Sequence, residues 1–242
     1  MAKTALITGA SGGIGYQTAL LFAKNGYNII YHYNKNKNDK QIETISKLTN
    51  CLAVKADFLN PDEILSLYET SVKTFGKIDC LVNNAAVDNY SLLIDETYDS
   101  ILSTINTNLT ASVYLTSLVS KNMIKFGGGN IINISSVYAK TGGSGESVYA
   151  ATKSALIGFT KSLASELSFS NIRVNAVAPG ITNTKMIAGL KTAEINDYTS
   201  NLAIKRVANA EEIARVIYFL ASDESGYISG ETVFVDGGAG LC

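Results

Sequence analysis

A tyrosine and a lysine four residues apart, Tyr149 and Lys153, are the side chains in this sequence best suited to proton transfer. On a helix, residues i and i+4 share one face and lie about 5–6 Å apart at Cβ. A lysine ammonium at that distance favours the phenolate, so we expect the pKa of Tyr149 to lie below its ordinary value of about 10. A phenol tuned in this way can give a proton to a carbonyl oxygen or take one from an alcohol.

Ser136 adds a hydroxyl group to this pair, because it follows a predicted strand at residues 131–134 and the helix carrying Tyr149 begins near the same edge. We expect Ser136 to hydrogen-bond the substrate oxygen and Tyr149 to exchange the proton. Lys153 would lower the tyrosine pKa and hold a ribose. A Tyr-x-x-x-Lys pair alone is common on helix surfaces, so this hypothesis depends on the motifs around it.

A glycine-rich turn joins a short apolar run, residues 5–7, to a helical pattern at residues 14–24. Helix N-termini carry free N–H groups that suit a pyrophosphate, and glycines let the backbone approach the phosphates closely. The spacing is Gly-x-x-x-Gly-x-Gly rather than Gly-x-Gly-x-x-Gly. We predict a dinucleotide site here, with a tight turn that binds nothing as the alternative. The residues expected to contact the nucleotide are Gly9, Ser11, Gly12, Gly13, Ile14 and Gly15.

The end of the second predicted strand, residues 28–33, lacks a carboxylate. Folds that bind NAD commonly place an acidic residue there for the ribose hydroxyls, whereas NADP needs a cation near its 2′-phosphate. This chain has Tyr33, Asn34 and Lys35, with Lys37 close behind. The pattern favours NADP (as NADPH) and does not exclude NAD; a solvated polar loop is the alternative.

Polar and small residues also follow the third and fourth predicted strands, residues 51–56 and 78–82. The carboxyl ends of parallel strands border the crevice in which such sheets bind ligands. The aspartate after the third strand either contacts the adenine or only forms a turn. The nucleotide contacts predicted at these two strand ends are Asp57, Phe58, Asn84, Ala85 and Ala86.

Strand and helix patterns alternate along the chain, which is typical of a parallel sheet covered on both faces. We expect an α/β, doubly wound Rossmann fold with a mainly parallel seven-stranded sheet, as a single domain over residues 1–242. Residues 98–125 predict one long helix, and residues 148–167 predict another. The Lys-, Thr- and Asn-rich segment 180–205 receives no helix or strand and is expected to form a substrate lid.

The composition allows a sizeable core, with 46% hydrophobic and 17% charged residues, and the net charge of −1 gives no electrostatic case for nucleic acid or an anionic membrane. The single histidine, His32, argues against a Ser-His-Asp hydrolase, and we assign it a structural role; no metal site is predicted. Cys51, Cys80 and Cys242 show no ligand spacing, which indicates a reduced, cytoplasmic protein. We see no signal peptide, and the uncharged run 100–120 is too rich in Ser, Thr and Asn to span a bilayer.

Together these motifs resemble the short-chain dehydrogenase/reductase family over essentially the whole chain. The matching positions are residues 8–15, Asp57, residues 83–86, Asn108, Ser136, Tyr149, Lys153, residues 179–180, Thr184 and residues 236–238. The resemblance implies a catalytic tetrad of Asn108, Ser136, Tyr149 and Lys153, in which Asn108 anchors a water that links the lysine to solvent. It also implies contacts with the nicotinamide and phosphate side of the cofactor from Pro179, Gly180, Thr182 and Thr184.

Within the family the chain is similar to bacterial 3-oxoacyl-(acyl-carrier-protein) reductases, through residues 149–159, 219–224 and 230–232. This implies an NADPH-dependent reductase of fatty-acid synthesis that turns a ketone into a secondary alcohol. Its substrate would be a small molecule or an acyl thioester, with an acyl carrier protein as a possible partner. The alternatives are a short-chain dehydrogenase for another alcohol or ketone (a sugar, polyol or steroid) and a non-catalytic dinucleotide-binding regulator, which the four filled catalytic positions disfavour.

Four residues depart from the reductase pattern. Gly13 stands where NADPH-using reductases often carry Arg, and Ala86 replaces a glycine. Gly127 and Ser170 align with the two arginines that grip the carrier protein, which weakens that assignment. The resemblance further implies a cytoplasmic homotetramer, in which helices 100–120 and 148–167 pair across one two-fold interface. Light scattering that gave a monomer mass at micromolar concentration would count against it.

Overall fold

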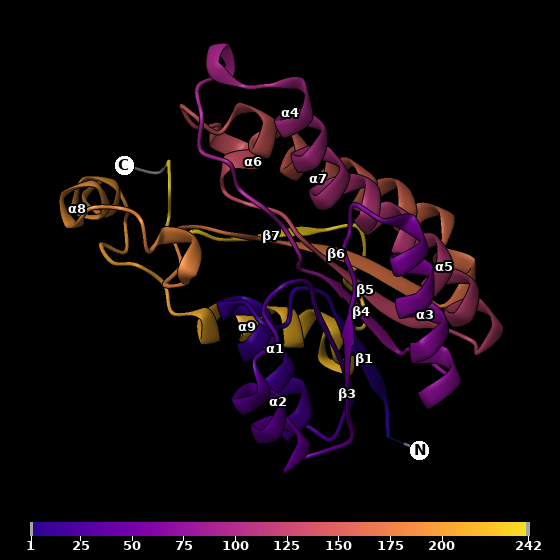
Figure 1. The fold of residues 1–242 in the computed structure, drawn as a ribbon. Helices are drawn as coiled ribbons and strands as arrows, with labels where there is room; N and C mark the ends of the chain where they lie inside the picture. The colour runs from indigo at the N-terminus through magenta and orange to yellow at the C-terminus, as the bar shows by residue number, and fades with distance from the viewer. Residues whose placement is uncertain (1, 241–242) are drawn as a thin grey trace.

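The computed structural model describes residues 2–240, and its framework is one seven-stranded sheet in the order β3-β2-β1-β4-β5-β6-β7 (Figure 1). All six neighbouring pairs are parallel. The strands are β1 (Thr4–Ile7), β2 (Asn28–Tyr33), β3 (Cys51–Lys55), β4 (Cys80–Asn83), β5 (Gly129–Ile134), β6 (Ile172–Pro179) and β7 (Thr232–Val235). The predicted α/β, doubly wound fold is confirmed, and the sheet is parallel throughout the described residues.

The strand order reverses at β1, because the chain runs outward to β3 and then returns to place β4 on the other side of β1. The two directions of winding separate at the tips of β1 and β4. Ligands of doubly wound sheets bind in the crevice at such a switch point. The topology therefore places the glycine-rich turn after β1 and the Asn-Asn-Ala-Ala segment after β4 at the same crevice.

Helices cover both faces of the sheet (Figure 1). One face carries α1 (Gly13–Lys24), α2 (Asp39–Ser46) and α9 (Ala210–Ala221). The other carries α3 (Pro61–Phe75), α4 (Tyr98–Ile105), α5 (Ala111–Lys125) and α7 (Ser147–Glu166). Two short helices, α6 (Tyr138–Thr141) and α8 (Thr192–Ser200), lie beyond the carboxyl edge of the strands.

The two hydrophobic cores follow from strand geometry, since successive side chains of a strand point to opposite faces. In β1, Ile7 joins the core under α1 and α9, whereas Leu6 joins the core under α3, α5 and α7. Tyr31 and Ile30 of β2 divide in the same way. Burial on both faces explains why these strands are apolar runs rather than alternating patterns.

The predicted helix over residues 98–125 is interrupted. A π-helical turn, η2 (Asn106–Thr110), separates α4 from α5. Such turns add a residue to the helix locally and are frequent at functional sites. Here the turn contains Asn108, whose side chain is fully buried. The uncharged helix buries Leu115 and Val119 against the sheet and leaves Val113 partly exposed, so cover by a partner subunit stays a prediction.

The segment predicted to be a lid contains two helical elements, η4 (Lys185–Ile187) and α8. The sequence of α8 has a weak apolar stripe, and its start is fixed locally, because the Glu194 carboxylate accepts a hydrogen bond of 2.7 Å from the Lys191 N–H. Capping of this kind satisfies helix-end N–H groups that have no helical partner. Because the apolar stripe is weak and a local contact sets the start of the helix, hydrophobic periodicity did not predict α8.

Other features bear on the bulk predictions. Cys51 and Cys80 are free thiols, and Cys242 lies outside the described residues. No helix within residues 2–240 has both the length and the apolar character needed to cross a membrane.

Candidate active site

The tips of β1 and β4 are tied together by the buried hydroxyl of Thr8. It donates to the Val82 carbonyl (3.2 Å) and accepts hydrogen bonds from the N–H groups of Asn84 (2.8 Å) and Ala85 (2.9 Å). The Asn84 amide donates to the Thr8 carbonyl (2.8 Å) in return. The glycine-rich turn and the Asn84–Ala86 segment are therefore one rigid unit, as their shared place at the switch point requires.

Glycine is needed at two points of this turn. Gly9 has φ +61°, in the left-handed region, and a Cβ there would lie 2.9 Å from the Ala85 Cα. A Cβ on Gly15 would overlap the Gly9 carbonyl oxygen. A third glycine, Gly12, is the N-cap of α1. Because it has no side chain, it cannot accept hydrogen bonds from the first N–H groups of the helix, and these groups remain available to a ligand. This cradle fits a pyrophosphate at the positive end of the helix.

The start of the 180–205 segment packs on the same turn. A Cβ on Gly13 would lie 2.7 Å from the Thr184 methyl carbon. Glycine at position 13, where related reductases often carry Arg, is thus matched to Thr184 in this chain, because a larger side chain would displace the threonine. Two residues predicted from different motifs to contact the cofactor therefore adjoin each other.

The tips of β2 and β3 bring Asn34 and Asp57 together. The Asn34 amide donates to an oxygen of Asp57 (3.4 Å), and that oxygen also accepts the Leu59 N–H (3.0 Å). The turn-forming role considered for Asp57 is therefore present. Lys35 is exposed and makes no ion pair with any of residues 2–240, whereas Lys37 pairs with Asp39 at 2.8 Å. Lys35 is therefore the lysine of this tip that is available to an anionic group.

His32 joins three strand tips. Its Nδ1 accepts the Gly9 N–H (3.0 Å), so the proton resides on Nε2, which lies 3.0 Å from the Ala56 carbonyl and donates to it. Phe58 stacks on the imidazole with ring centroids 4.4 Å apart. Burial lowers the pKa of His32 to about 4, so the ring is neutral. These contacts give His32 the structural role predicted for it, and the stacking buries the Phe58 side chain.

The tip of β5 holds the first turns of α7. The Lys153 ammonium donates to the Ile134 carbonyl (2.8 Å), and the Ser135 hydroxyl donates to the Lys153 carbonyl (2.7 Å). Lys153 is buried, with its Nζ 5.4 Å from the centre of the Tyr149 ring. Ser136 follows at the same tip, where its oxygen accepts the Tyr138 N–H (3.2 Å). The structure thus brings Ser136, Tyr149 and Lys153 together.

The predicted lowering of the Tyr149 pKa below its ordinary value is contradicted by this structure. Burial raises the pKa of Tyr149 above its ordinary value, and the charge of Asp88 adds to the rise, while interaction with the Ser136 hydroxyl lowers it. Burial also lowers the pKa of Lys153, to about 8. Desolvation opposes the charged form of both groups, and the ammonium is occupied by the Ile134 carbonyl. The phenol therefore stays protonated at neutral pH, the form that a general acid requires.

Asn108 hydrogen-bonds the backbone of the segment after β4, beside the predicted catalytic residues on α7. Its side-chain amide accepts the Val87 N–H and donates to the Val87 carbonyl, both at 2.8 Å, and donates weakly to the Thr152 hydroxyl (3.4 Å). These bonds hold the segment after Ala86 against α7 next to Lys153. The predicted water relay through Asn108 stays a prediction.

The tip of β6 forms the last side of the crevice. Gly180 follows the strand directly, donates to the Val235 carbonyl (2.9 Å), and has no room for a Cβ, which would lie 2.8 Å from the Asp236 Cα. The Thr182 hydroxyl is buried and donates to the Gly180 carbonyl (2.9 Å). Pro179, Gly180 and Thr182 therefore form a rigid turn that leads into Thr184 and the following segment.

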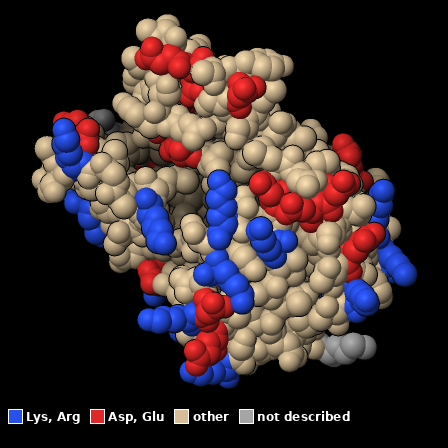
Figure 2. Space-filling view, in the orientation of Figure 1, with Lys and Arg blue, Asp and Glu red and all other residues tan. Residues whose placement is uncertain are grey.

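Figure 2 shows the crevice as a hollow between the part that carries α8 and the body of the sheet. Lys and Arg side chains lie along its lower border, and acidic atoms lie on its upper wall. A cationic border beside a helix N-terminus favours an anionic ligand.

Comparison with known proteins agrees with this geometry. A family model described as "Enoyl-(Acyl carrier protein) reductase" matches residues 9–240. A 3-oxoacyl-(acyl-carrier-protein) reductase of Thermotoga maritima is 40% identical over 244 residues, with 98% of this chain and 97% of the relative covered. A solved structure titled "short chain dehydrogenase/reductase family protein" is 31% identical, covers 98% of this chain and 96% of that one, and has a TM-score of 0.86.

The chain belongs to the short-chain dehydrogenase/reductase family. It is therefore an oxidoreductase that uses a nicotinamide dinucleotide, and the family predicted from its motifs is confirmed. A further structural relative is the acetoin dehydrogenase of Salmonella typhimurium, which is 31% identical, has a TM-score of 0.91, and is matched over 100% of this chain and 97% of its own.

Two carboxyl groups of this short-chain dehydrogenase/reductase were missed by the sequence analysis. Asp88 directly follows Val87, which Asn108 holds, and Glu146 lies three residues before Tyr149. The charge of Asp88 acts on both Tyr149 and Lys153. The sequence shows that each carboxyl group is close along the chain to a predicted site residue, but it does not show that Asp88 and Glu146 lie close to each other.

The buried, neutral His32 makes stability depend on pH. Its pKa is about 4 in the folded chain and about 6.5 when unfolded, so the unfolded state binds more protons between these values. The stabilisation is complete above pH 6.5 and is lost as pH falls toward 4. We predict that the free energy of unfolding of the wild type exceeds that of His32→Gln at pH 7, and that this gap shrinks by about 2 kcal/mol at pH 5. Urea denaturation at both pH values measures it; a constant gap would contradict the assignment.

Proposed function

We propose that this chain is an NADPH-dependent reductase of 3-oxoacyl thioesters in cytoplasmic fatty-acid synthesis. The observation that carries the proposal is the convergence of Ser136, Tyr149 and Lys153 beside the glycine cradle, in a chain 40% identical to a named 3-oxoacyl reductase over nearly its whole length. Ser136 follows the carboxyl end of β5, and Tyr149 and Lys153 lie on α7, at the edge where doubly wound sheets bind ligands.

The nucleotide would be held by the first turn of α1, by Asn34 and Lys35 at the 2′-phosphate, and by Asn84 and Thr184. When bound, NADPH supplies the hydride that reduces the ketone carbon. Lys153, one helical turn from Tyr149, would hold the ribose.

The protein's own part in the reaction is proton transfer. Ser136 donates a hydrogen bond to the ketone oxygen, and the Tyr149 hydroxyl gives its proton to that oxygen as the negative charge develops. Since the pKa of Lys153 is about 8, its ammonium is mostly charged at neutral pH and can stabilise the tyrosinate and return a proton to it.

A second candidate is the reduction of a small neutral diketone or hydroxyketone. It is favoured by the structural match to an acetoin dehydrogenase and by Gly127 and Ser170, which provide no cation for an acidic carrier protein. Those residues lie at the amino ends of β5 and β6, away from Tyr149. The missing cations therefore bear on docking of a carrier protein at that edge and not on the reaction at Tyr149, so we keep the thioester as the proposed substrate.

Replacing Tyr149 with Phe tests the proton donor. We expect kcat for acetoacetyl thioester with NADPH to fall about 10²- to 10⁴-fold, because the general acid is lost, while the Kd for NADPH stays within about 2-fold. Stopped-flow absorbance at the nicotinamide band and fluorescence titration measure the two quantities.

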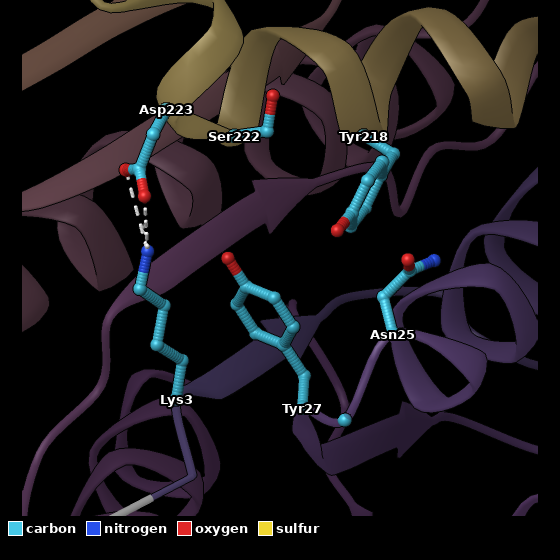
Figure 3. Close-up of a pocket in the computed structure, with 7 residues that line it drawn as sticks. Lys3, Asn25, Tyr27, Tyr218, Ser222 and Asp223 are labelled. Atoms are coloured by element: carbon cyan, nitrogen blue, oxygen red, sulfur yellow. Dashed lines mark hydrogen bonds and ion pairs between the residues drawn. The ribbon is translucent and has the colours of Figure 1, made fainter.

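The matched control is Tyr218→Phe. Tyr218 lines a separate hollow with Tyr27, Asn25 and the Lys3–Asp223 ion pair, near the amino end of β1 (Figure 3). Its loss of a hydroxyl should leave kcat unchanged. Equal activity of Tyr149→Phe and the wild type would reject the assigned acid, and a wild type that reduces acetoin-type ketones but no 3-oxoacyl thioester would reject the substrate.

Lys35 tests the choice of nucleotide. We expect Lys35→Ala to raise the KM for NADPH about 5-fold and to leave the KM for NADH unchanged, because only NADPH carries the 2′-phosphate. Lys37→Ala is the control, since Lys37 is already paired with Asp39, and its effect should be smaller. If the wild type prefers NADH, or if Lys35→Ala affects both nucleotides equally, the NADPH assignment fails.

A further inference from the structure

A pair of acidic side chains lies at the crevice next to the proton donor. Asp88 comes from the segment after β4, and Glu146 is the N-cap residue of α7. Their carboxyl groups are hydrogen-bonded to each other. The pair therefore joins two segments. One is the segment after β4, whose Val87 is held by Asn108, and the other is the start of α7, which carries the proton donor Tyr149.

The pair is held by backbone contacts rather than by cations. The Glu146 N–H donates to the Gly143 carbonyl (3.1 Å), and the preceding residue, Gly145, accepts the Ser91 N–H (3.0 Å). A Cβ on Gly143 would lie 3.2 Å from the Glu146 Cβ, so the loop closes tightly behind this side chain. These bonds fix Glu146 against the Asp88 segment before any ligand binds.

Outside the pair, these carboxyl groups have no partner for their buried oxygens. Glu146 is only 8% exposed, and its Oε2, like Asp88 Oδ1, is buried and receives no hydrogen bond from any other group among residues 2–240. Within the same residues neither group forms an ion pair. Burying two carboxyl groups whose only partners are each other is costly, and their retention calls for a functional explanation.

The pair lies close to Tyr149. Asp88 and Glu146 both act electrostatically on Tyr149 and on Tyr138 of α6, and Asp88 also acts on Lys153. Helix α6 packs beside α7, on the opposite side of the sheet from α1, whose N-terminus would bind the nucleotide phosphates (Figure 1). The pair thus borders the part of the crevice that remains for the ketone.

At neutral pH the pair keeps a negative charge. Burial, followed by the hydrogen bond and the charge of Asp88, raises the pKa of Glu146 to about 8. Glu146 is therefore mostly protonated at neutral pH, and the negative charge beside it is that of Asp88. A charge in a partly buried site, where screening is weak, acts strongly on a second charge nearby.

We propose that Asp88, held in place by Glu146, is a specificity-determining residue that repels substrates with a carboxylate next to the reacting ketone. The cleft would accordingly accept 3-oxoacyl esters and thioesters, which are neutral at that position, and reject free 3-oxo acids. This inference deepens the proposed function, on which it rests for the substrate class.

The test compares a neutral and an anionic substrate with the same ketone, ethyl acetoacetate and acetoacetate. In the wild type we expect kcat/KM for the ester to exceed that for the acid by at least about 100-fold. In Asp88→Asn, which removes the charge, we expect kcat/KM for acetoacetate to rise about 10-fold or more, so that the ratio falls. The matched control is Asp95→Asn, an exposed aspartate of the same segment, in which the ratio should not change.

Two results would overturn the inference. One is an ester-to-acid ratio of kcat/KM that is unchanged in an Asp88→Asn variant that still binds NADPH. If Asp88→Asn does not fold, Asp88→Ser removes the same charge and takes its place in the test. The other is a wild type that reduces acetoacetate as well as the ester. Failure of the proposed function would look different, since the wild type would then reduce the ester but not an acetoacetyl thioester.

Discussion

The attachment of α7 to the tip of β5 is the contact on which the site depends. The buried Lys153 ammonium donates to the Ile134 carbonyl, and the Ser135 hydroxyl donates to the Lys153 carbonyl, so side chain and backbone of one residue are both fixed. Hydrogen bonds of a charged group are among the stronger ones inside a protein. One turn earlier on the helix, Tyr149 takes its position from these bonds, and Ser136 takes its own from the same strand tip.

The electrostatics of the site follow from the burial that this attachment imposes. Desolvation lowers the pKa of Lys153 to about 8 and raises that of Tyr149, so both shifts favour neutral forms. A protonated phenol and a lysine that can still carry charge suit a reductase, because the phenol must release its proton and then recover it. The adjacent carboxyl pair of Asp88 and Glu146 strengthens the rise in the tyrosine pKa, and so links the substrate side of the crevice to the acid.

Much of this arrangement could be predicted from sequence, because parallel strands with helical connections leave few possible orders and place every strand end at one edge. Gly9 and Gly15 indicated a close approach of backbones, and the structure shows Ala85 and the Gly9 carbonyl as the groups approached. The direction of the Tyr149 pKa shift could not be predicted, since i,i+4 spacing reports proximity but not burial. Nor could the Asp88–Glu146 contact or the π-helical turn at Asn108, which depend on packing between distant segments.

The central claim is that Tyr149 is the proton donor to a ketone held at the tip of β5. The most direct measurement is a crystal structure of the chain with NADP⁺ and an acetoacetyl thioester, a complex in which both reactants are oxidised and no hydride can transfer. The account predicts the C3 ketone oxygen within about 2.6–3.2 Å of both the Tyr149 and Ser136 hydroxyl oxygens. An ordered thioester whose ketone oxygen faces away from Tyr149 would contradict it.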